Sequence, residues 1–124
     1  LAYCLPLIIA LLISEQDHLV LLENPEAHLH PKGQLKMGLL AARAAAAGSQ
    51  VIVETHSDHL LNGIRLAVKS NVIKPDWTRF LFFSKTESDH ITIETPEILE
   101  SGKMNSWPNG FFDEWENALT QLIR

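Results

Sequence analysis

The spacing of apolar residues changes from segment to segment along the chain, and these changes predict an α/β fold. Residues 18–23 and 50–54 are short apolar runs that each end at a glutamate, as expected of strands covered on both faces of a parallel sheet. The segment between them is predicted to be a helix, because Pro31 suits a first helical position and Gly48 suits the residue after the last turn. A strand, a helix and a second strand in this order form the unit from which parallel sheets are built.

The rest of the chain adds helices on both sides of this unit and a hairpin after it. Ser57 is a suitable N-cap for a helix whose apolar residues recur on one face, and Asn71 and Pro75 end that helix. We therefore predict a mostly parallel sheet flanked by helices, with an antiparallel hairpin at its edge. The other predicted elements are a buried helix at 3–14, a strand at 79–84, a half-buried strand at 90–95, a loop at 96–110 and a helix from Phe111 to Leu122.

Composition limits the chain to one domain at most, since it has 124 residues, of which 46% are apolar. The net charge of −5 argues against a general nucleic-acid surface, so DNA binding would need a local basic patch. The single cysteine, Cys4, suits a reducing compartment and hence the cytoplasm. The apolar run at 5–13 is too short to span a bilayer, so we expect no membrane partner. Since the chain opens with Leu1 close to a helix, we expect it to be a piece of a longer protein.

Polar residues follow both strands at the point where each strand ends. Glu23 is followed by Asn24 and Glu26, and His56 lies two residues beyond Glu54. Ligands of open α/β sheets collect at the carboxyl ends of the strands. A carboxylate there can hold nucleotide-bound Mg²⁺, and an imidazole can reach a terminal phosphate. Asn24 or Glu26 would order the attacking water, and of these two only Glu26 can act as a base.

The segments around these residues resemble a known family. They read Leu-Leu-Glu-Asn-Pro-Glu-Ala-His-Leu-His-Pro at 21–31 and Val-Ile-Val-Glu-Thr-His-Ser-Asp-His at 51–59. Together they look like the C-terminal half of an ABC-type P-loop ATPase, and within that group they resemble the overcoming-lysogenization-defect (OLD)-like and related bacterial AAA ATPases. The resemblance implies a P-loop NTPase fold, ATP and Mg²⁺ as cofactors, ATP hydrolysis, and work by the whole protein in DNA transactions or phage defence.

The resemblance also implies roles for single residues. Glu23 resembles the Walker B metal carboxylate, and Asn24 stands where many relatives have the catalytic glutamate. Residues 27–30 resemble the D-loop that crosses to a partner protomer, and His56 resembles the switch histidine. The candidate catalytic residues are Asn24, Glu26 and His56, and the candidate nucleotide-side residues are Glu23, His28, His30 and His56.

The chain divides, on this resemblance, into residues 1–100, the C-terminal part of the ATPase head, and residues 101–124, a C-terminal extension with an aromatic helix. The segment 107–115 resembles an extension of unassigned function in one branch of these ATPases. Residues 2–6 look like the tail of the signature segment, although Ala2 stands where a serine is expected.

The phosphate-binding motif G-x-x-x-x-G-K-[ST] does not occur in the sequence. Gly102-Lys103-Met104 lacks both the earlier glycine and the hydroxyl. We therefore expect the missing Walker A half and a second head, in a head-to-head homodimer, as partners. We also expect that this chain alone does not bind ATP tightly.

A zinc-dependent metallohydrolase is one alternative. Glu54, His56, Asp58 and His59 differ by one residue from the H-x-H-x-D-H cluster of metallo-β-lactamase-like enzymes. Imidazole and carboxylate are suitable zinc ligands, and such a site would activate water. His28 and His30 would add two further ligands.

A non-catalytic interaction module is the other alternative. In it Phe111, Phe112 and Trp115 would dock a partner, as aromatic anchors do at interfaces. Their helical spacing instead favours packing of the last helix on the chain's own sheet.

Overall fold

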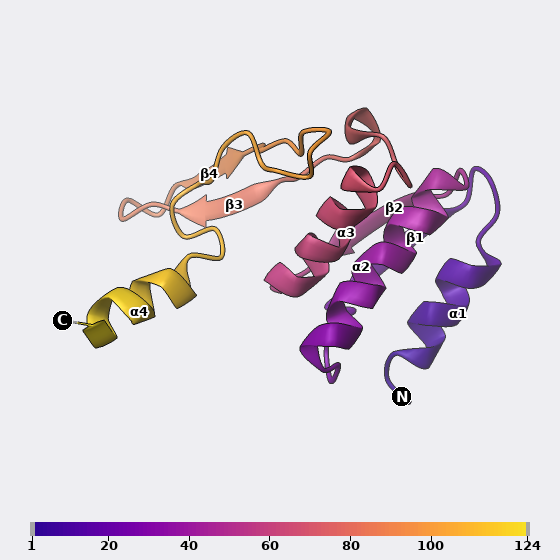
Figure 1. The fold of residues 1–124 in the computed structure, drawn as a ribbon, viewed down its shortest axis with the longest axis horizontal. Helices are drawn as coiled ribbons and strands as arrows, with labels where there is room; N and C mark the ends of the chain where they lie inside the picture. Colours follow the sequence, from indigo (N-terminus) through magenta and orange to yellow (C-terminus); the bar gives the residue numbers. More distant parts are fainter. Residues whose placement is uncertain (1, 124) are drawn as a thin grey trace.

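The computed structural model describes residues 2–123, so Leu1, on which the expectation of a longer protein rests, and Arg124 lie outside the described residues. Three helices lie side by side over a small sheet, and a hairpin and a last helix lie beyond them (Figure 1). The elements are α1 (Leu5–Ile13), β1 (Leu19–Glu23), α2 (Pro31–Ala46), β2 (Gln50–Glu54), α3 (Asp58–Lys69), the 3₁₀ turn η1 (Pro75–Trp77), β3 (Phe82–Lys85), β4 (Ile91–Glu94) and α4 (Glu114–Ile123).

Strands β1 and β2 form a parallel pair, in register from Leu19 opposite Gln50 to Glu23 opposite Glu54. The mostly parallel larger sheet that we expected is not present among the described residues, which form two separate sheets of two strands. The prediction that both faces are covered is also wrong. Leu22 is buried under the helices, whereas Leu21 on the opposite face is 66% exposed. The helices therefore cover one face and leave an apolar face open.

Helices α2 and α3 pack closely, because each has a glycine at the point of contact. A β-carbon on Gly38 would collide with the carbonyl oxygen of Leu60. A β-carbon on Gly63 would collide with that of Leu35. The two backbones therefore touch directly. Since each helix follows one of the two parallel strands, both helices begin at the same edge of the sheet (Figure 1).

The predicted helix boundaries around the parallel pair are confirmed by local signals. Pro31 occupies the first turn of α2, and Gly48, just past its end, has a φ of 110° that a residue with a side chain rarely adopts. The Ser57 side chain accepts from the backbone N–H of Leu60 and so caps α3.

Helix α1 is not the buried core helix that its composition predicts. Leu11 faces the core, whereas Leu5, Ile9, Leu12 and Ile13 are exposed. A helix that is apolar all round is normally buried on all sides. The outer side of α1 thus adds to the uncovered apolar surface. Among residues 2–123, no helix has both the length and the apolar character needed to cross a bilayer.

Strands β3 and β4 pair in antiparallel order, with Phe83 opposite Ile93, and form a sheet of their own rather than an edge of the parallel pair. Every residue of β4 is exposed, so the expected half-buried strand is wrong. The loop after β4 packs on α3 instead. There the Arg65 side chain donates to the Gly102 carbonyl (Nε···O 2.8 Å) and lies over the Trp107 ring.

Helix α4 begins at Glu114, three residues later than predicted. Phe111 is buried outside the helix, in edge-to-face contact with Phe82 and Trp107. No described side chain of α4 is buried, so the helix does not pack on the chain's own sheet as its spacing suggested. It extends away from the rest of the molecule (Figure 1).

Candidate functional site

The carboxyl ends of β1 and β2 bring two acids side by side. Glu23 and Glu54 are direct neighbours in the parallel register and both are exposed. They line a hollow of about 380 Å³ together with Leu21, Leu22 and Ile52. Two carboxylates in an open hollow at the end of a parallel pair can bind a divalent cation, and a ligand can supply the remaining oxygens around that cation.

The turn after β1 is held to the end of β2 by its backbone. The Asn24 N–H donates to the Glu54 carbonyl at 2.9 Å. Asn24 has a φ of 45°, a left-handed conformation that asparagine tolerates better than most residues. This geometry turns the chain sharply at the strand end and ties the backbone of Asn24 to the end of β2.

Glu26 connects the two loops of the site. Its Oε1 accepts from the backbone N–H of His56 at 2.9 Å, and its Oε2 is buried without a hydrogen-bond partner among the described residues. The carboxylate therefore lies between the loop after β1 and the loop after β2. Its contact with a backbone donor suits a positioning role.

The imidazole of His56 lies beside Glu54. Its Nε2 is 3.1 Å from Glu54 Oε1, and its side chain is 84% exposed. The prediction that Glu23 and His56 follow neighbouring parallel strands is confirmed, since Glu54, which contacts His56, is also the register partner of Glu23. The ring is thus held at the strand ends and open to a ligand.

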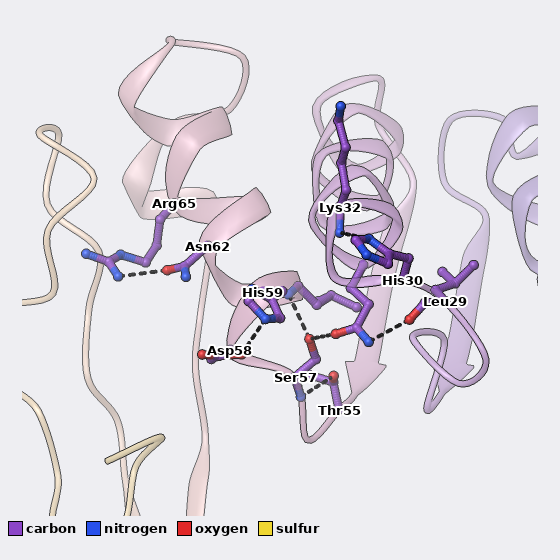
Figure 2. Close-up of polar contacts among 11 residues, drawn as sticks. Leu29, His30, Lys32, Thr55, Ser57, Asp58, His59, Asn62 and Arg65 are labelled. Carbon is purple, nitrogen blue, oxygen red and sulfur yellow. Dashed lines mark hydrogen bonds and ion pairs between the residues drawn. The ribbon is translucent and has the colours of Figure 1, made fainter. Parts of the chain in front are cut away.

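The N-terminus of α3 is tied to α2 by side-chain hydrogen bonds (Figure 2). The Ser57 hydroxyl donates to Gln34 Oε1 at 2.6 Å while accepting from the Leu60 N–H. The Gln34 amide in turn donates to the Leu29 carbonyl at 2.9 Å. These bonds fix the segment that follows β1 against the loop that carries His56.

His28 and His30 are both engaged in contacts away from the two acids. The His28 ring stacks on Tyr3, with ring centroids 4.4 Å apart, and its φ of 64° makes it a left-handed turn residue. His30 is the N-cap of α2, where its Nδ1 accepts from the Lys32 N–H (Figure 2). The D-loop-like segment is therefore held at its second and last residues by these two histidines.

The zinc cluster is not formed. Within residues 2–123 no three His, Cys, Asp or Glu side chains are arranged to hold a metal ion. His59 lies 3.7 Å from Asp58 on α3, and His56 is directed to Glu54. The described side chains therefore lend no support to the alternative of a zinc hydrolase.

The candidate site residues taken from the sequence did not include two residues that the structure brings to this site. Glu54 ends a strand as Glu23 does, and that shared position was the signal for its inclusion. Gln34 gave no such signal, because its partner Ser57 lies at the start of α3 and only the packing of α2 on α3 brings the two side chains together.

Comparison with protein families divides the chain at α3. Residues 4–61 match the AAA ATPase domain family. That region contains β1, β2 and the loops that follow them, and it is therefore similar to part of an AAA-family ATPase. Residues 73–122 match a family described only as a protein of unknown function (DUF3696). No curated protein and no solved structure matches the chain.

Proposed function

We propose that α1 to α3 form the metal and switch half of an ABC-type P-loop ATPase that binds and hydrolyses Mg-ATP. One observation carries the proposal. The parallel register sets Glu23 beside Glu54, and His56 is held against Glu54 at the same edge, within the region similar to an AAA ATPase domain. The likeness of 21–31 and 51–59 to OLD-like ATPases supports the finer assignment.

In this proposal Glu23 helps to hold Mg²⁺. Proteins bind this ion through one or two carboxylates while the phosphates and waters supply the remaining oxygens. An exposed carboxylate at the lip of an open hollow fits that requirement. Bound Mg²⁺ would neutralise charge on the phosphates during transfer.

The water-ordering role falls to Asn24, and Glu26 positions the switch loop. One Glu26 oxygen accepts a hydrogen bond from the His56 N–H, and the other is buried. The carboxylate is therefore poorly placed to take a proton from water. Asn24 lies next to Glu23, and its amide can orient a water without accepting its proton. Glu54 holds the His56 imidazole, so it sets the orientation of the group that contacts the terminal phosphate.

The phosphate cradle comes from another segment, the Walker A half of the same ATPase. Leu19, Leu21 and Ile52 expose an apolar face, whereas parallel sheets are normally covered on both faces. Further strands and helices of the missing half would cover that face and the free strand edges. The anchored segment 27–30 would then contact a second head in a head-to-head dimer.

Steady-state ATP hydrolysis tests the proposal in the protein that joins this chain to its phosphate-binding loop. Glu23→Gln should reduce kcat by about 100-fold or more, because the metal loses its protein carboxylate. His56→Ala should reduce kcat by about 100-fold while nucleotide binding changes little, because a contact to transferring phosphate is made mainly in the transition state.

Glu15→Gln and His90→Ala are the matched controls. Both residues are exposed, and neither belongs to the loops that follow β1 and β2. They should leave turnover within about twofold of the unaltered protein. Full turnover by Glu23→Gln or by His56→Ala would remove the basis of the proposal.

A further inference from the structure

Helix α4 has an apolar stripe that nothing in the described chain covers. Trp115, Leu119 and Leu122 recur at helical spacing, with Ile123 beside them. Trp115 is 71% exposed and Leu122 is 81% exposed. A helix of ten residues is only marginally stable in water by itself, so this stripe needs a surface to pack on.

The hairpin of β3 and β4 has an uncovered apolar face of its own. Side chains of paired residues lie on the same face of an antiparallel sheet, so the pairing of Phe83 with Ile93 and of Lys85 with Ile91 places one apolar row there. Leu81 continues this row by alternation. We call this surface the outer hairpin face; its residues are Leu81, Phe83, Ile91 and Ile93, and all four are exposed.

The α4 stripe cannot reach the outer hairpin face of its own chain. Phe82 points to the opposite face, where its ring contacts Phe111. Only Phe112 and Asp113 separate Phe111 from α4, and two or three residues span roughly 10 Å at most. Asp113 is held as well, since its Oδ2 accepts from the Gly110 N–H at 2.8 Å. The helix is therefore kept on the Phe111 side of the hairpin.

We propose that the α4 stripe of one copy packs on the outer hairpin face of a second copy, and that the second copy returns the same contact. A two-fold axis makes the two contacts equivalent and closes the assembly as a dimer. Apart from Ile123, both surfaces lie within residues 73–122, the part that matches the family of unknown function. The dimer is thus separate from the strand-end site.

The area suffices for a stable dimer. Each contact brings together eight large apolar side chains, which at about 100 Å² apiece and two contacts give on the order of 1,500 Å². This is the size of a standard stable interface.

Sedimentation velocity of the 124-residue chain over a concentration series tests the dimer. The unaltered chain should dimerise, and Leu122→Glu or Ile93→Lys should each weaken dimerisation by about tenfold or more. Gln121→Glu and Thr92→Lys introduce the same charges on the other side of the same elements. They should leave the dissociation constant within about twofold.

Mixing the two interface variants distinguishes a dimer in which each α4 packs on the other copy's hairpin from any other dimer. A pair made of Leu122→Glu and Ile93→Lys regains one unaltered contact, so it should associate more tightly than either variant does with itself. A variant that had merely unfolded could not regain this association.

Three results would overturn the proposal. They are a chain that stays monomeric throughout the series, a dimer unaffected by both substitutions, and a mixture that associates no better than its components. Loss of the dimer in Ile52→Glu alone, with Leu122→Glu and Ile93→Lys still dimeric, would place the interface on the open face of β1 and β2 instead.

Discussion

The Glu26 carboxylate is the residue that makes the two loops of the site one unit. It belongs to the turn after β1, yet it accepts its hydrogen bond from the His56 backbone, thirty positions along the chain. A carboxylate bonded to a backbone donor is a strong, oriented contact. The position of His56 therefore depends on Glu26, and so does the distance of the imidazole from any phosphate.

Two substitutions of Glu26 separate positioning from base catalysis. Glu26→Gln keeps an oxygen that can accept from the His56 N–H, so kcat of the complete ATPase should fall by no more than about threefold. Glu26→Ala loses the acceptor and should reduce kcat by about tenfold or more. Steady-state hydrolysis measures both. If Glu26→Gln were as inactive as Glu26→Ala, the carboxylate would be acting as the base.

Sequence predicts the residue types of the site but not all their contacts. Glu23 and His56 could be placed at one edge, because parallel strands that follow each other in a strand-helix-strand unit place their carboxyl ends together. The role of Glu26 could not be predicted, since its partner is a backbone group brought close only by the folded loops. The stacking of His28 on Tyr3 could not be predicted either, because the fold brings these two distant residues together.

At the scale of elements, the crossing of α2 and α3 positions the site. Gly38 and Gly63 let the two backbones meet, and the Ser57–Gln34 hydrogen bond then forms at the ends of the helices. Helix starts were predictable where a proline or a serine cap marks them locally. The start of α4 was not, because Phe111 has helical spacing but is buried with Phe82, and Phe112 has a φ of 53°.

The glycine crossing gives a stability prediction. Gly63→Ala should lower the free energy of unfolding by about 2 kcal/mol or more, because the added methyl group meets the Leu35 carbonyl and forces the helices apart. Urea unfolding followed by circular dichroism measures the change. Gly33→Ala is the control, since its β-carbon would have ordinary contact with Leu29 at 3.5 Å. It should be neutral or stabilising by roughly 0.5–1 kcal/mol. Equal stabilities of the two variants would contradict the close crossing.

At the scale of the whole molecule, the described chain leaves four apolar surfaces uncovered. They are the open face of β1 and β2, the outer side of α1, the outer hairpin face and the α4 stripe. Periodicity alone predicted burial for the first because an unbroken apolar run looks the same whether one face or both are covered.

The strand ends present Glu23 and Glu54 next to each other, and the chain carries a net charge of −5. Nothing in the sequence supplies the backbone cradle that would offset this charge against a triphosphate.

The 124-residue chain should therefore bind Mg-ATP more weakly than about 100 μM, since Mg²⁺ held by one carboxylate cannot compensate for the absent phosphate-binding loop. Isothermal titration calorimetry measures this directly. Glu23→Gln should remove whatever weak signal remains, and Glu15→Gln, the matched control, should preserve it. Addition of the segment that contains the G-x-x-x-x-G-K-[ST] motif should bring the dissociation constant into the micromolar range, because the cradle amides then share the phosphate charge with Glu23-bound Mg²⁺. Micromolar binding by the chain alone would mean that the strand ends hold phosphates without a cradle, and the division of the site between two segments would then be wrong.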